Sequence, residues 1–150
     1  MRVLLPSALL SLALPSLTLV ACGEVVDDTS VDTTTASPSD LLEVIGDWSD
    51  NYGGSTTITT AKWGADTVVR YDNIGNRAVL RAPADAAYNP SKFSKNVWTE
   101  PADGSFWLCT VDFGLDTEEG AMASTKTADA SKPAEGGCGG FAWTKMTRKP

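Results

Sequence analysis

The chain has 150 residues, of which 42% are hydrophobic and 21% charged, a composition typical of one small globular domain. Its 12 basic and 19 acidic side chains give a net charge of −7, which argues against a nucleic-acid partner because such binding depends on cationic side chains. There is no histidine, so the commonest general base and the commonest metal ligand are missing, and no Gly-x-Ser-x-Gly nucleophile motif occurs. We therefore expect no enzyme activity, no metal site and no cofactor.

The first 21 residues have the features of a secretory signal, with one charge at Arg2 followed by a Leu/Ala/Ser-rich apolar run. Pro6 and Pro15 interrupt this run, which makes it a poor candidate for a membrane-spanning helix. The run ends in Leu19-Val20-Ala21-Cys22, which resembles the lipobox of bacterial lipoproteins. The resemblance implies a signal peptide of residues 1–21, and a Cys22 that carries acyl chains such as palmitate and becomes the new N-terminus.

Lipid on Cys22 would hold the protein on a membrane of the cell envelope without spanning it, because several acyl chains bind more firmly than one. By resemblance to the sorting of such lipoproteins, Gly23 in place of an aspartate favours the outer membrane and leaves open which side the domain faces. The alternative is an ordinary signal peptide cleaved nearby, which would leave Cys22 as an odd thiol in an exported protein.

Residues 22–40 form a polar segment with five acids, no base and no aromatic residue. Such a segment cannot bury enough apolar surface to offset the entropy of ordering, so we expect a flexible tether. A calcium site at Asp27, Asp28 and Asp32 is the alternative interpretation, but the spacing lacks the alternating acids and the glycine of a calcium-binding loop.

Residues 41–150 contain every tryptophan, tyrosine and phenylalanine, and 14 acids against 11 bases give them a net charge of −3. Short segments rich in Thr, Val and aromatic residues alternate with Gly, Asn, Asp and Pro, a pattern typical of antiparallel β structure. The sequence predicts one all-β domain, a small meandering β-barrel or a sandwich of about seven strands with one short helix. The strands are expected at residues 45–49, 55–63, 67–71, 77–82, 92–99, 105–113 and 141–147.

The clearest hairpin is predicted at residues 92–113, with a Pro-Ala-Asp-Gly turn between its strands. On the second strand, the alternate residues expected to face the core are Trp107, Cys109, Val111 and Phe113. Phe106 and Leu108 on the opposite face indicate that this side is partly covered as well.

A helix is expected at residues 117–128, which are rich in Ala, Glu, Met and Lys. Asp116 and Glu119 have the spacing of a capping box at its start. We expect the helix to cover one end or one face of the sheet.

With Cys22 assigned to the lipid, Cys109 and Cys138 remain as an even pair in an oxidising compartment, so the sequence predicts a disulfide. Closing a loop of 28 intervening residues stabilises the fold by about 3–4 kcal/mol, because it lowers the entropy of the unfolded chain. The glycines expected to let the backbone approach the partner strand closely are Gly136, Gly137, Gly139 and Gly140.

The first predicted strand opens with Gly46-Asp47-Trp48, followed by Asp50-Asn51, Gly53 and the β-branched Ile58. This run resembles the Gly-x-Trp opening of lipocalins and, more closely, of avidins. The resemblance implies a meandering β-barrel with the tryptophan plugging its base. Where avidins offer Asn and Ser to their ligand this sequence has Asp50 and Gly54, so biotin binding is not expected.

Two functions are compatible with these features. The first is a module that binds a glycan or a small apolar ligand, because five tryptophans exceed what so small a core needs and exposed rings bind such ligands. The candidate ligand-binding residues lie near predicted strand ends and turns and are Trp63, Tyr71, Tyr88 and Trp98. The second is an envelope protein that binds other proteins, as an inhibitor or a structural subunit, through an exposed edge strand or apolar patch.

Metabolic labelling with a palmitate analogue is expected to mark the protein in its host, because Cys22 would carry the acyl chains. Cys22→Ser should abolish the label, measured by in-gel fluorescence after coupling of a dye. The double variant Cys109→Ser/Cys138→Ser is the control and should keep it. Label that survives Cys22→Ser would contradict the lipobox assignment.

Overall fold

The computed structural model describes residues 41–150. The predicted signal peptide at residues 1–21, the lipidation site at Cys22 and the tether at residues 22–40 lie outside the described residues. The described elements are β1 (Gly46–Asp50), β2 (Ser55–Ile58), β3 (Lys62–Trp63), β4 (Asp66–Asp72), β5 (Arg77–Arg81), β6 (Phe93–Trp98), β7 (Ser105–Leu115), α1 (Glu118–Ala123), β8 (Gly137–Cys138), β9 (Phe141–Ala142) and β10 (Thr144–Arg148).

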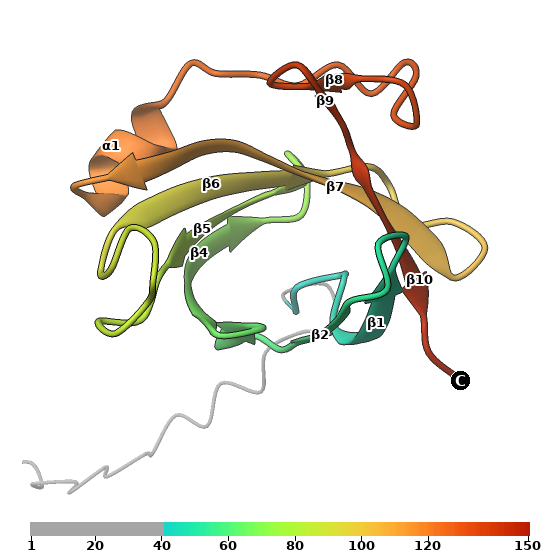
Figure 1. Cartoon of the computed structure of the whole chain (residues 1–150), viewed down its shortest axis with the longest axis horizontal. Coiled ribbons are helices and arrows are strands. Elements are labelled where there is room, and N and C mark those ends of the chain that lie inside the picture. Colours follow the sequence, from blue (N-terminus) through green and yellow to red (C-terminus); the bar gives the residue numbers. More distant parts are fainter. Residues whose placement is uncertain (1–40) are drawn as a thin grey trace, which may run out of the picture. The chain divides into compact units, whose positions relative to one another are not determined.

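Eight of these strands close into one antiparallel barrel (Figure 1). The order around the wall is β1-β10-β7-β6-β5-β4-β3-β2, so β1 to β7 form a meander and β10 closes the wall between β7 and β1. β8 and β9 form a separate two-stranded hairpin. The structure confirms the all-β prediction and decides between barrel and sandwich in favour of the barrel.

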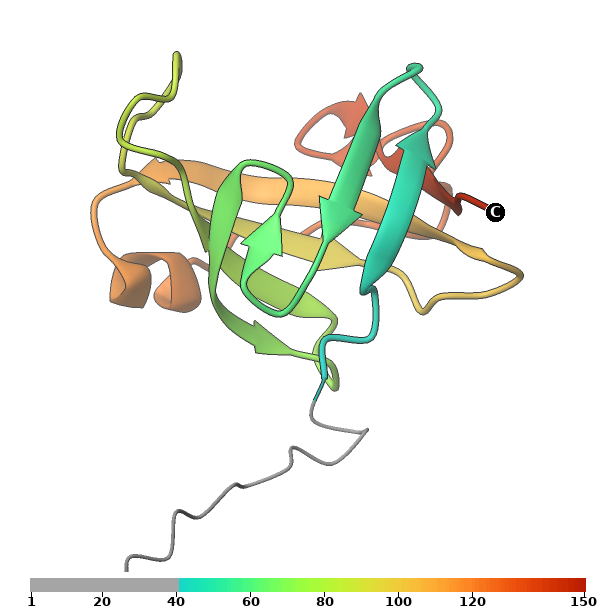
Figure 2. The ribbon, with the colours of Figure 1, turned by 90° about the horizontal axis from the view of Figure 1, so that it is seen from below.

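Large apolar side chains fill the barrel, and Trp48 is the largest of those that are fully buried. Trp48 is 1% exposed, its ring meets Phe106 edge-on with centroids 4.7 Å apart, and its Nε1 donates to the carbonyl oxygen of Val44 at 2.9 Å. Val44 and Leu42 are themselves buried in the barrel core, so the segment that leads into β1 plugs the barrel at this end. Figure 2 shows the backbone of this segment running into the start of β1. The buried members of this barrel core are Leu42, Val44, Trp48, Ile58, Trp63, Val68, Ala78, Leu80, Trp98, Phe106 and Met146.

Two of the predicted strands are each divided in the structure. The strand expected at residues 55–63 is β2 and β3, because Thr59 turns the chain and its Oγ1 accepts from the backbone N–H of Ala61 at 3.2 Å and of Lys62 at 2.9 Å. The strand expected at residues 141–147 is β9 and β10, which are divided at Trp143. Trp143 is only 3% exposed, and it is buried in a second apolar cluster outside the barrel core.

β7 packs on both of its faces, and the prediction of which face lines the main core was wrong. Phe106 and Leu108 belong to the barrel core, whereas Cys109 and Val111 belong to a second cluster. Phe113, also expected in the core, is 66% exposed. The reason is that the chain between α1 and β10 crosses the outer face of β7 and covers it (Figure 1).

Helix α1 is shorter than predicted and has a different cap. Thr117 caps it in place of Asp116, and the Thr117 Oγ1 accepts from the backbone N–H of Gly120 at 3.0 Å. Ser124 ends the helix, and its hydroxyl donates to the carboxylate of Asp112 at 2.6 Å. Ala121 is fully buried where α1 covers the outer wall of the barrel. Within residues 41–150, no helix has the length and apolar character needed to cross a bilayer.

The predicted disulfide between Cys109 and Cys138 is present, with the two Cα atoms 5.6 Å apart. It fastens β8 to β7 and lies within the second apolar cluster, which we call the outer cluster. The buried members of the outer cluster are Cys109, Val111 and Trp143, and the half-buried ones are Val97, Trp107, Ala128 and Cys138.

Gly137→Ala is expected to lower the free energy of unfolding by about 2 kcal/mol or more, because Gly137 has φ +90° and an added Cβ would lie 1.9 Å from the carbonyl oxygen of Asp129. Gly136→Ala is the matched control: its Cβ would meet nothing within 4 Å, so the change should stay within about 0.5 kcal/mol. Urea denaturation measures both. Equal midpoints for the two variants would contradict the close approach seen at Gly137.

Candidate functional site

The four aromatic residues predicted to bind a ligand do not share a surface. Trp63 and Trp98 lie together, but in the barrel core, with ring centroids 5.8 Å apart and exposures of 5% and 3%. The indole N–H of Trp98 donates to the carboxylate of Glu43. Tyr71 packs against the same core, and Tyr88 is 86% exposed between β5 and β6. These four rings therefore offer no common face to a ligand.

The two edges of β7 are paired unevenly. β6 pairs with β7 along one edge, from Leu108 to Leu115. β10 pairs along the other edge only as far as Leu108, which lies opposite Thr144. Figure 1 shows β7 continuing past the point where β10 leaves it. Within the described chain, residues 109–115 thus have a strand partner on one side only, and we call their other side the free edge of β7.

A cleft of about 570 Å³, which we call the edge cleft, lies along the free edge. Its lining consists of Leu108, Thr110, Val111, Phe113, Lys126, Cys138, Gly139, Phe141 and Thr144. Leu108 packs with the barrel core, whereas Val111 and Cys138 belong to the outer cluster. The cleft is therefore lined by side chains from both faces of β7. This fits a position at the edge of the strand, where side chains of both faces can be reached.

Phe113 and Phe141 are the most exposed apolar side chains of the edge cleft, at 66% and 77%. The sequence pattern predicts Phe113 in the core and Phe141 in a strand, and it points to neither as a site residue. Gly114 directly follows Phe113 and has φ +72°, and two glycines precede Phe141. Gly114 and Gly140 directly border the strands predicted at residues 105–113 and 141–147, and that signal could have indicated that Phe113 and Phe141 lie at strand ends.

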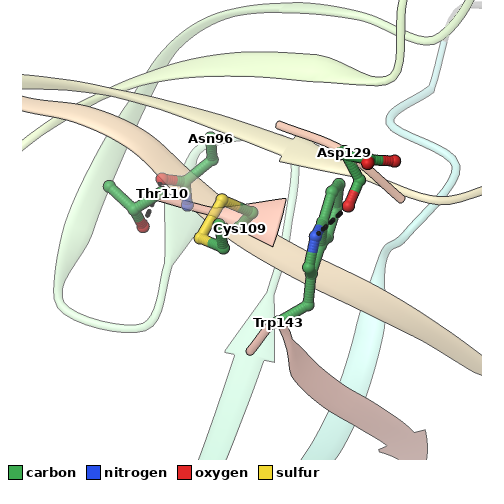
Figure 3. The surroundings of a disulfide bond; sticks show 6 residues. Asn96, Cys109, Thr110, Asp129 and Trp143 are labelled. Atoms are coloured by element: carbon green, nitrogen blue, oxygen red, sulfur yellow. Dashed lines mark hydrogen bonds between the residues drawn. A yellow bond between two sulfur atoms is a disulfide. The ribbon is translucent and has the colours of Figure 1, made fainter. Parts of the chain in front are cut away.

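The disulfide forms a fixed wall of the edge cleft. Figure 3 shows a hydrogen bond on either side of it: the Thr110 hydroxyl donates to Asn96 Oδ1 at 2.8 Å, and Trp143 Nε1 donates to the carbonyl oxygen of Asp129 at 3.0 Å. Asn96 is 4% exposed and Trp143 is 3% exposed. Buried residues that are held by hydrogen bonds, Asn96 and Trp143, therefore flank the disulfide on its two sides.

Asp112 positions Lys126, the charged residue in the lining of the edge cleft. Asp112 pairs with Lys95 while Thr110 pairs with Asn96, so one extra residue makes a β-bulge in β7 between the two pairs. The carboxylate of Asp112 accepts from Lys126 Nζ at 2.6 Å, and also from the backbone N–H of its neighbour Phe113 at 3.0 Å. It thereby holds both Lys126 and the Phe113 backbone at the cleft.

The charges at this position are asymmetric. The side chain of Asp112 is 8% exposed, whereas that of Lys126 is 65% exposed. The hydrogen bond from Lys126 lowers the pKa of Asp112, and the hydrogen bond from Ser124 lowers it further. The buried carboxylate thus favours its ionised form, and the exposed Lys126 contributes its ammonium group to the lining of the cleft.

The edge cleft has the chemistry of a binding site. Its lining carries one ammonium group, two threonine hydroxyls and no carboxylate. Across residues 41–150, no group of three or more cysteine, aspartate or glutamate side chains lies close enough to hold a metal ion.

No family model, curated protein or solved structure matches this chain.

Asp112→Asn is expected to change how stability depends on pH. Because the pKa of Asp112 is lower in the folded protein, its charge stabilises the fold above the unfolded value of about 4. That contribution is lost as the pH falls through the lower, folded pKa. The urea midpoint of the wild type should therefore drop more steeply below about pH 4 than that of Asp112→Asn.

Asp116→Asn is the control for this measurement. Lys92 also lowers the pKa of Asp116, but the side chain of Asp116 is 81% exposed, so solvent screens the pair and the effect should be smaller. Parallel pH curves for the wild type and Asp112→Asn would contradict the role given to the Asp112 carboxylate.

Proposed function

We propose that this protein is a bacterial envelope lipoprotein, anchored to the outer membrane through Cys22, whose barrel is a non-catalytic module that binds an apolar ligand in the edge cleft. The observation that carries the proposal is the pair of exposed rings, Phe113 and Phe141, on one cleft with an apolar floor. The lipobox resemblance at Cys22 supports the location.

The size and lining of the edge cleft suit a ligand of this kind. Its volume of about 570 Å³ falls within the range of about 300–1,000 Å³ that is usual for ligand pockets. Removing a phenylalanine side chain from water contributes about 1.5–3 kcal/mol. A ligand that covers both Phe113 and Phe141 would therefore gain several kcal/mol, enough to offset part of the entropy lost on binding.

The placement of the aromatic residues favours an apolar ligand over a glycan. Sugar rings stack on the open faces of tryptophan or tyrosine, and the predicted candidates Trp63 and Trp98 have their faces in the barrel core. The edge cleft offers phenylalanine rings with few polar groups beside them. Its hydroxyls and ammonium group would orient a ligand, while the apolar surface supplies the affinity.

The tether would let the barrel meet its ligand away from the lipid. Residues 23–40 reach at most about 60 Å when fully extended. The described chain begins at Leu41, next to the segment that plugs one end of the barrel. The edge cleft lies instead on the side wall, along β7. The anchor and the cleft therefore use different parts of the domain.

The double variant Phe113→Ala/Phe141→Ala is expected to weaken binding of an anionic apolar dye, an anilinonaphthalene sulfonate, at least about tenfold, because both rings would cover it. Fluorescence titration of the chain that starts at Gly23 measures this. Tyr88→Ala, which removes an equally exposed ring elsewhere, is the matched control and should leave the dissociation constant unchanged. Equal binding by the double variant and the wild type would refute the proposal.

A further inference from the structure

We propose that the ligand of the edge cleft is an extended, acidic and apolar segment of another envelope protein, which adds to the free edge of β7 as a further strand. This inference rests on the proposed function, because it names the ligand of the same cleft. It differs in requiring hydrogen bonds to the β7 backbone, which an apolar small molecule does not need.

The backbone of β7 is available for such pairing. The carbonyl of Trp107 accepts from the backbone N–H of Thr99 at 2.9 Å, so Trp107 turns its backbone groups toward the β6 side. Backbone groups alternate between the two sides along a strand, so Thr110 turns its N–H and C=O toward the free edge. Thr110 is exposed, and β10 has already ended its pairing at Leu108. An added strand could therefore bond to Thr110 without displacing β6 or β10.

Within residues 41–150, the segment that precedes β10 is held away from the free edge of β7. Trp143, which immediately precedes β10, is turned into the outer cluster and is 3% exposed. Its backbone N–H donates to the carbonyl of Pro133 at 2.8 Å, and its Nε1 donates to the carbonyl of Asp129. These bonds hold the residues before β10 away from the line that β10 would follow if it continued along β7.

The two-sided lining of the edge cleft matches an added strand. Successive side chains of a strand point to opposite faces. The cleft offers apolar contacts on both: Leu108 belongs to the barrel core, and Val111 and Cys138 to the outer cluster. The exposed rings of Phe113 and Phe141 would cover its apolar side chains. We therefore expect apolar side chains on both faces of the bound segment.

Charge favours an acidic partner over a second copy of this chain. Lys126 is the single charged residue in the lining of the edge cleft, and its side chain is 65% exposed. An ammonium group has three donors, and Asp112 takes one of them, so a partner carboxylate can take another. A two-fold contact between two copies would instead leave the remaining donors of both Lys126 side chains without a carboxylate acceptor, because the lining of the edge cleft contains none.

The test uses the full chain in lipid nanodiscs and a fluorescein-labelled octapeptide of valine, threonine and one glutamate, ordered so that valines lie on both faces of the extended peptide. Two further peptides carry N-methyl groups on alternate amides, one on the odd positions and the other on the even. In a strand, only one of these sets faces β7. Fluorescence anisotropy, with empty nanodiscs as the blank, is expected to show binding of the unmodified peptide and of one methylated peptide, and at least tenfold weaker binding of the other.

Charge provides the second arm. Lys126→Met should weaken binding of the peptide several-fold, and so should exchange of its glutamate for lysine. Lys132→Met, which removes a similarly exposed lysine outside the cleft lining, is the matched control and should have no effect. The strand proposal would be overturned if both methylated peptides lost binding or if both kept it. Failure of the unmodified peptide to bind would overturn it as well.

These outcomes separate the inference from the proposed function. If Phe113→Ala/Phe141→Ala removes dye binding while the peptides fail the methylation test, the cleft binds small apolar ligands and the strand proposal falls alone. If neither dye nor peptide binding depends on the two rings, both proposals fall. A concentration-dependent dimer in sedimentation experiments that Phe113→Ala/Phe141→Ala abolishes would assign the edge to a second copy and overturn the acidic partner.

Discussion

The architecture depends on one strand that serves two apolar clusters. β7 gives Phe106 and Leu108 to the barrel core, and Cys109 and Val111 to the outer cluster. Removing both faces of a strand from water requires cover on both, so the chain after β7 must cross back over it before it can close the barrel. That crossing sets the positions of α1, the β8–β9 hairpin and the disulfide. The edge cleft results from this crossing, because β10 pairs with β7 only between Ser105 and Leu108 and leaves the rest of that edge unpaired.

The free edge of β7 is managed only in part. Exposed edges invite pairing with other chains, and proteins blunt them with bulges, charges or covering segments. Here a β-bulge, the buried Asp112 and the exposed Lys126 lie at the edge, while Phe113 and Phe141 leave it apolar. The charges and the β-bulge limit which chains could pair with this edge, whereas the apolar rings would stabilise a chain that does pair. This combination is the one that the proposed binding of another strand requires.

The sequence predicted the β class, most strands and the disulfide, because local alternation and cysteine pairing carry that information. It misassigned the faces of β7, because Phe106 and Leu108 are as apolar as Cys109 and Val111, and a period of two cannot choose between two apolar faces. It missed the edge cleft because this depends on where the pairing with β10 ends, at Leu108. That endpoint follows from the burial of Trp143, a contact between distant segments. The burial of Trp63 and Trp98 in the barrel core likewise depends on contacts between distant segments.

The plug at the base of β1 has a mechanical consequence for an anchored protein. Tension between the membrane and a partner held at the side wall would enter the barrel at Leu41. The next points of resistance are the fully buried side chains of Leu42 and Val44, and Asn73, whose amide nitrogen donates to the Leu41 carbonyl and whose oxygen accepts from the Glu43 backbone N–H. A pull would have to extract apolar side chains before it could peel β1 from its neighbours. A load on the proposed anchor at Cys22 would therefore reach the buried side chains of Leu42 and Val44 before the pairing of β1.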